Sequence, residues 1–153
     1  MYNASVSLTS KIMKALPISI ICFAILLAAC DARETRVNNK EDLENGQKIS
    51  TEFLEHRKTM DLEKAMELTQ IANDNPEYGR HISNLKKIDD MVGRIVEFKV
   101  DSARSSVVKE GNELNGEIKV SYTVVYQRGQ ATEDYYMGYV NDKLKIIQYV
   151  VDL

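Results

Sequence analysis

The hydrophobic period of the chain changes at Gly93. Before this glycine, apolar residues recur every three or four positions, as on one face of a helix, and after it they alternate with polar residues, as in half-buried strands. The alternation is clearest between residues 118 and 126, where the apolar positions are Ile118, Val120, Tyr122, Val124 and Tyr126. Helices followed by an antiparallel meander are typical of an α+β fold, in which the helices pack on one face of the sheet.

Two helical regions precede Gly93. The first has its apolar residues at Leu43, Ile49, Phe53 and Leu54, is interrupted near Thr59, and resumes after Asp61, a suitable N-cap, as one bent helix or two short ones. The segment 73–76, Asn-Asp-Asn-Pro, ends this region and starts the next, with Pro76 at the first helical position and Asn75 or Asp74 as its cap. One face of the next helix carries Tyr78, Ile82, Leu85 and Met91 or Val92.

About four strands are expected after Gly93. Val96, Phe98 and Val100 alternate with polar residues in the first, 118–126 forms the second, and residues 131–140 and 144–151 are rich in aromatic and β-branched side chains. We expect turns at 110–112, 115–116, 128–129 and 141–142, and irregular structure over the polar segment 102–116. No proline follows Pro76, so none of these strands is interrupted by one.

The N-terminal region has the pattern of a signal peptide. Lys11 and Lys14 precede an apolar run from Ala15 to Leu27, which has the length of a signal-peptide h-region. Residues 15–29 fall short of the roughly 20 apolar residues of a spanning helix, and Pro17 interrupts their start. Translation from Met1 or from Met13 gives the same apolar segment.

The four residues Leu27-Ala28-Ala29-Cys30 resemble the lipobox of bacterial lipoproteins, an aliphatic residue, two small residues and a cysteine. This resemblance implies cleavage between Ala29 and Cys30, with diacylglycerol, and palmitate-type acyl chains, attached to Cys30. Two or three acyl chains anchor a protein stably, whereas one chain alone binds only marginally. Asp31 resembles the signal that retains enteric lipoproteins in the inner membrane; the other interpretation is that Asp31 only opens a polar tether.

These features divide the chain into a signal peptide at 1–29, a lipidated cysteine with a polar linker at 30–42, and a single α+β domain at 43–153. The only other cysteine, Cys22, lies in the signal segment, so the processed chain has no pair of cysteines for an internal disulfide. The whole chain has a net charge of −3, and both charged residues before Cys30 are lysines, so the remainder is more acidic still. This balance argues against nucleic acid as a partner.

The segments 53–54, 61–66, 93–95 and 143–147, with their surrounding hydrophobic and turn patterns, resemble the small uncharacterised lipoproteins of the nuclear transport factor 2-like, cystatin-like superfamily. The resemblance covers about residues 43–153. It implies a cone-like architecture in which a curved antiparallel sheet wraps around the N-terminal helices. Enzymes of this fold place an acid inside the concavity of the sheet, and Asp134 is the nearest candidate, although we favour a surface position for it.

Motifs for catalysis, cofactors and metals are weak. Glu52 and His56 share a helical face, but no further histidine or cysteine is placed to complete a metal site with them, so we expect neither a metal nor a cofactor. Nucleotide-binding and nucleophile-elbow motifs are missing from the sequence. Tyrosines crowd the last three strands and form a candidate ligand or partner surface, with core packing as the favoured alternative. They are Tyr122, Tyr126, Tyr135, Tyr136, Tyr139 and Tyr149.

The sequence thus favours a non-enzymatic binding or assembly module, tethered by lipid to a membrane of the cell envelope, facing the periplasm or the cell exterior, with a protein partner. Two alternatives stay open. One is a cone-fold protein that binds a small molecule or acts as an enzyme, and the other is a toxin-neutralising or envelope-stress lipoprotein.

Overall fold

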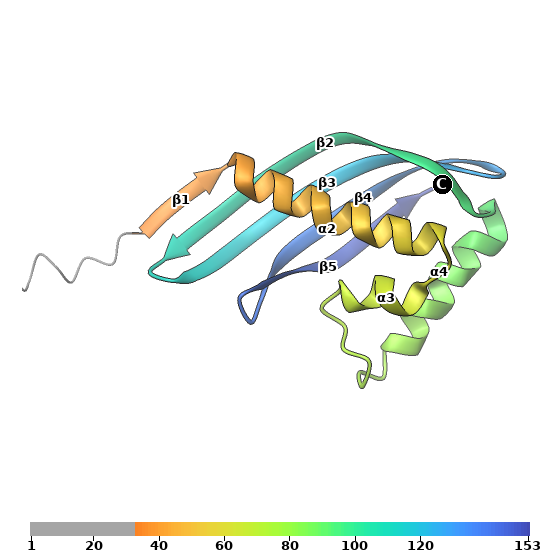
Figure 1. Cartoon of the computed structure of the whole chain (residues 1–153), viewed down its shortest axis with the longest axis horizontal. Coiled ribbons are helices and arrows are strands. Elements are labelled where there is room, and N and C mark those ends of the chain that lie inside the picture. The colour runs from red at the N-terminus through yellow and green to blue at the C-terminus, as the bar shows by residue number, and fades with distance from the viewer. Residues whose placement is uncertain (1–32) are drawn as a thin grey trace, which may run out of the picture. The chain divides into compact units, whose positions relative to one another are not determined.

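The computed structural model describes residues 33–153, whose strands form one five-stranded antiparallel sheet in the order β1-β2-β3-β4-β5 (Figure 1). The strands span Arg33–Val37 (β1), Ile95–Glu110 (β2), Glu113–Tyr126 (β3), Gly129–Val140 (β4) and Lys143–Asp152 (β5). Strands β2 to β5 follow one another along the chain through two-residue turns. The α+β class and the antiparallel meander are therefore confirmed, while the expected number of four strands is wrong, because β1 adds a fifth.

Helices α2 (Lys40–Lys58), α3 (Leu62–Glu67) and α4 (Tyr78–Val92) supply the other layer, and α2 lies across one face of the curved sheet (Figure 1). The predicted interruption after α2 is confirmed: Thr59 ends α2, and the side chain of Asp61 accepts a hydrogen bond from the backbone N–H of Lys64 at the start of α3. Two short-range signals in the sequence, a break and a cap, thus fix how the chain turns from α2 to α3.

The polar segment predicted as a linker is ordered from Arg33 onward, so that prediction is wrong for this part. Residues 33–37 pair with residues 106–110 of β2, and the Asn39 side chain caps α2 by accepting from the N–H groups of Glu41 and Asp42. Asp42 is buried and pairs with Arg36 of β1 at 2.9 Å. Burial raises the pKa of the Asp42 carboxyl, while the Arg36 charge opposes the shift. A polar strand at a sheet edge carries no apolar alternation, so periodicity could not reveal it.

Apart from a turn at residues 111–112, the segment 102–116 is strand rather than irregular structure. β2 runs to Glu110, and β3 begins at Glu113, so the two strands form a long hairpin around Gly111, whose φ is +60°. The expected turn at 115–116 is absent: both residues lie in β3 and pair with Val108 and Val107. Gly116 has φ +148°, and a Cβ there would come within 2.2 Å of the Ser106 carbonyl oxygen. This glycine therefore permits close approach of two strands instead of marking a turn.

The alternation in β3 sets which sheet face is buried. Its five apolar positions from Ile118 to Tyr126 are all buried against the helices, as predicted. The alternation at the start of β2 is different: Ile95 is buried, and Val96 is 50% exposed. A register shift between Ile95 and Glu97 explains the difference, because a β-bulge inserts one residue and reverses the side-chain direction.

Helix α4 contributes less to the core than α2. Leu85 is its only residue that is fully buried, with Tyr78, Ile82 and Val92 partly buried, whereas Met91 is 59% exposed. The helix begins at Tyr78, two residues after the predicted Pro76, and Gly93 follows it with φ +83°. The predicted apolar face is thus confirmed with Val92, rather than Met91, as its last member.

The signal segment, the cleavage site between Ala29 and Cys30, and Asp31 lie outside the described residues. Within residues 33–153, no helix combines the length and the apolar composition that crossing a membrane requires.

Candidate functional site

A fully buried ion pair connects α2 to the sheet. The guanidinium Nη1 of Arg57 lies 2.6 Å from Oε2 of Glu133 on β4, and both side chains are 0% exposed. Arg57 also donates to the hydroxyl oxygens of Tyr126 at 3.0 Å and Tyr135 at 3.2 Å, and these two hydroxyls donate to the Glu133 carboxylate. We call these four residues the buried ion-pair cluster.

The phenols of the cluster are held neutral. Burial is the largest cause that raises the pKa of Tyr135, and the nearby Glu133 charge adds to it, while Arg57 opposes the shift. The pKa of Tyr126 is raised for the same reasons. Each tyrosine can therefore donate a proton in a hydrogen bond to the carboxylate throughout the physiological pH range. Because the cluster is sealed from solvent, its arrangement suits fixing α2 on the sheet rather than contacting a substrate.

Asp134, the sequence candidate for an acid in the concavity, lies on the opposite sheet face. Its carboxylate accepts from Ser121 at 2.6 Å and pairs with Lys119 at 2.6 Å. Burial acts to raise the pKa of Asp134, but these bonds to Lys119 and Ser121 outweigh it and lower the pKa. The inward-facing acid of β4 is Glu133, one residue earlier. The surface position that we favoured for Asp134 fits a strand that buries Ala131, Glu133, Tyr135 and Met137.

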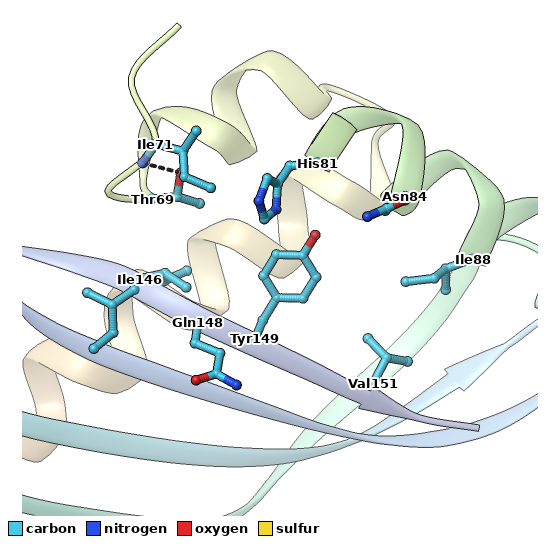
Figure 2. Close-up of a pocket in the computed structure, with 10 residues that line it drawn as sticks. Thr69, Ile71, His81, Asn84, Ile88, Ile146, Gln148, Tyr149 and Val151 are labelled. Atoms are coloured by element: carbon cyan, nitrogen blue, oxygen red, sulfur yellow. Dashed lines mark hydrogen bonds between the residues drawn. The ribbon is translucent and has the colours of Figure 1, made fainter. Parts of the chain in front are cut away.

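An open groove runs between α4 and the edge strand β5 (Figure 2). Its volume is about 360 Å³, within the range of roughly 300 to 1,000 Å³ of small-ligand sites. We call it the α4–β5 groove. Its lining is mostly apolar with a few polar groups: Thr69, Ile71, His81, Asn84, Ile88, Ile146, Ile147, Gln148, Tyr149 and Val151.

Tyr149 and His81 face each other across the α4–β5 groove, as Figure 2 shows. Their rings meet edge to face with centroids 6.3 Å apart, and Tyr149 rests on Phe53 of α2 at 5.7 Å. Burial raises the pKa of the Tyr149 phenol, so this group stays a neutral hydroxyl. The Nδ1 atom of His81 is buried and has no hydrogen-bond partner among the described residues.

One end of the groove is closed by the chain segment after α3. Thr69 forms an isolated parallel bridge with Ile146 of β5, and the Thr69 hydroxyl donates to the Met66 carbonyl and accepts from the N–H of Ile71 at 3.2 Å (Figure 2). The segment is thus held by its bridge to β5 and by the hydrogen bonds of the Thr69 hydroxyl to Met66 and Ile71. The groove is thus a preformed depression with one fixed end.

The six tyrosines do not form one surface. Tyr122, Tyr126 and Tyr135 are buried in the core beneath α2, in agreement with the packing alternative. Tyr136 shares the outer sheet face with Lys119, whose ammonium lies 5.2 Å from its ring centroid, whereas Tyr139 is half-buried and the pKa of its phenol is raised by burial. Only Tyr149 lines the α4–β5 groove.

Glu52 and His56 lie one helical turn apart, with 3.8 Å between Oε1 of Glu52 and Nε2 of His56. No group of three or more metal-binding side chains assembles in the part of the chain that the structure describes. Glu52 and His56 therefore stay an isolated pair on a helix surface.

Sequence reasoning missed the cluster and the groove. The cluster had a signal: Arg57 follows Phe53 by four residues on the buried helix face, and Glu133 has the strand parity of Ala131 and Tyr135. The groove had no signal in the sequence, because it depends on the distance between α4 and β5 in the folded chain.

Comparisons with protein-family models, curated proteins and solved structures find no significant match to this chain.

Proposed function

We propose that this chain is a lipid-anchored bacterial envelope protein whose domain, residues 33–153, is a non-enzymatic binding module. The anchoring half of the proposal depends on Leu27-Ala28-Ala29-Cys30, which has the residue types of a lipobox after a basic and apolar leader. The protein then resides on the exported side of the cell membrane, and Asp31 favours the inner membrane in a host that sorts lipoproteins as enteric bacteria do.

The binding half depends on one observation, the preformed α4–β5 groove with its mostly apolar lining. Its ten lining residues include no carboxylate and no cysteine, and the buried Arg57–Glu133 pair is sealed beneath α2. The lining groups that could act as acid, base or nucleophile are His81, Tyr149 and the Thr69 hydroxyl, and this hydroxyl is already hydrogen-bonded to the Met66 carbonyl and the Ile71 N–H. No carboxylate in the lining is placed to orient His81 as a base. A groove that offers apolar contact and a few hydrogen-bonding groups supports binding better than catalysis.

Helices α2 to α4, followed by the antiparallel strands β2 to β5, agree with the architecture that the resemblance to the nuclear transport factor 2-like, cystatin-like lipoproteins implies. This agreement supports membership as a proposal. Binding of a small molecule is the second candidate function, favoured by the groove volume of about 360 Å³. The enzymatic alternative loses its proposed acid, since Asp134 lies on the opposite sheet face.

Two experiments in the bacterium of origin test the two halves separately. Metabolic labelling with an alkyne-tagged fatty acid should mark the wild-type chain and leave Cys30→Ser unmarked, and equal labelling of both would contradict the anchor. For the groove, a photo-crosslinking amino acid at Asn84 should give a discrete adduct, while the same group at the neighbouring Ser83, which lies outside the groove lining, should not. Indistinguishable behaviour at the two positions would contradict a binding role for the groove.

A further inference from the structure

Strand β5 is an edge strand that already accepts an extended segment on its open side. The N–H of Gln70 donates to the Ile146 carbonyl at 2.9 Å, and the N–H of Ile146 donates to the Leu68 carbonyl at 2.9 Å. These bonds belong to the isolated parallel bridge between Thr69 and Ile146. The fold therefore shows that a residue of extended chain pairs at this edge of β5.

The pairing ends abruptly after Ile147. The side-chain amide of Gln70 donates to the Ile147 carbonyl at 3.1 Å, and the chain then departs toward α4. From Gln148 to Asp152, strand β5 pairs only with β4 among residues 33–153, so its other side has no strand beside it. An open edge of this kind presents N–H and C=O groups that can pair with an added strand.

The α4–β5 groove lies along this open edge. In Figure 2, Tyr149 and Val151 of β5 point toward His81 and Ile88 of α4. On the other face of the strand, Val150 is 42% exposed. An extended chain added here would meet apolar surface with alternate side chains on both faces. A small apolar ligand would fill the groove and leave the backbone edge unpaired.

We propose that the α4–β5 groove binds an extended peptide segment of a partner protein, which adds to β5 alongside residues 148–152 and continues the pairing begun by Thr69. An apolar or aromatic side chain of the peptide enters the groove between Tyr149 and Ile88. Backbone pairing supplies affinity and the groove supplies side-chain selectivity. This inference rests on the proposed function, because it names the partner of the same groove.

The test uses the full chain, purified from membranes in detergent, and a phage-displayed library of nine-residue peptides. The library has apolar or aromatic residues at alternate positions and Ser, Thr, Lys or Glu between them. Enriched peptides are synthesised, and their affinities are measured for the wild type, for Asn84→Trp, which fills the groove, and for Ser83→Trp, the matched control on the same helix. Both positions are exposed, so each variant should fold.

We expect Asn84→Trp to weaken binding by at least about tenfold, a change of about 1.4 kcal/mol, while Ser83→Trp leaves it within about twofold. N-methylation of alternate peptide residues on the pairing side should abolish binding, and bound peptide should slow hydrogen exchange in residues 148–152. The inference would be overturned if the library yielded no peptide whose binding is weakened by Asn84→Trp. It would also be overturned if N-methylation of the peptide left binding unchanged at every position. A groove-specific adduct from Asn84 in cells would then leave the binding function standing without strand addition.

Discussion

Helices α2 and α4 belong to one helical layer but are held in different ways. α2 lies across the sheet and buries Phe53, Leu54 and Arg57, the last of them in an ion pair with β4. α4 buries only Leu85 completely and stands beside the edge strand, with the groove between them. The difference indicates that α2 and the sheet form the stable unit of the fold, and that α4, one wall of the proposed binding groove, is attached to this unit less tightly.

Breaking the ion pair should have the largest effect. Arg57→Met leaves the buried Glu133 carboxylate without its cation, so we expect the free energy of unfolding to fall by about 3–5 kcal/mol. The double variant Arg57→Met/Glu133→Leu should recover much of this loss, because no uncompensated charge is left. Urea titration measures both. A single variant within about 1 kcal/mol of the wild type would mean that the pair does not hold α2 on the sheet.

Matched truncations compare the packing of the two helices directly. Leu54 and Leu85 are both 0% exposed. We expect Leu54→Ala to lower the free energy of unfolding by an amount near the upper end of about 2–5 kcal/mol. Leu85→Ala should lower it by an amount near the lower end of this range, because α4 can relax toward the space that the shorter side chain leaves. Denaturant unfolding checks the order. Equal losses would contradict the looser attachment of α4.

Two glycines allow the same substitution in each helix with opposite results. A Cβ on Gly46 in α2 would lie 2.5 Å from Cγ2 of the buried Ile118, whereas a Cβ on Gly79 in α4 would have no neighbour within 4 Å. Gly46→Ala should therefore destabilise the protein by about 1–3 kcal/mol through overpacking. Gly79→Ala should stabilise it by about 0.5–1 kcal/mol through helix propensity. Thermal melts of the two variants measure these changes. A loss of stability in Gly79→Ala would contradict the open space around residue 79.

The smallest expected effect is a pH dependence at Asp89 of α4. Burial raises the pKa of this carboxyl, with Arg57 opposing the shift and Glu133 adding to it. A raised acid pKa means that the folded state holds the proton more tightly than the unfolded chain, so stability falls as pH rises through the folded-state pKa. Asp89→Asn should flatten this part of the stability profile. A profile unchanged by the substitution, or an NMR titration of Asp89 with a normal or lowered pKa, would contradict the burial of this group.

The sequence predicted what local patterns control. The α+β order, the break after α2, the Asp61 cap and the buried face of β3 follow from periodicity and capping. β1 was missed because an edge strand with Arg33, Glu34 and Arg36 has no apolar alternation. The side-chain direction near Val96 was wrong because a bulge adds one residue without a sequence signal.

The candidate site was less predictable than the fold. The parity of Ala131, Tyr135 and Met137 could have placed Glu133 inside the core in place of Asp134, and the helix face of Phe53 could have placed Arg57 opposite it. The six tyrosines were predicted as a surface because tyrosine is frequent in the last three strands, and of these six only Tyr149 lines the groove. The groove arises from tertiary spacing between α4 and β5, which no local pattern in the chain specifies.

Hydrogen exchange under native conditions, with added subdenaturing urea, tests most directly whether α4 moves as a unit separate from α2 and the sheet. The relevant amides are those of Leu54 and Leu85, which lie inside α2 and α4, away from the helix ends. We predict that Leu54 exchanges only through global unfolding, with the full urea dependence, whereas Leu85 exchanges at a lower free energy with a smaller urea dependence. The same free energy and the same urea dependence at both amides would show one cooperative unit and contradict the account.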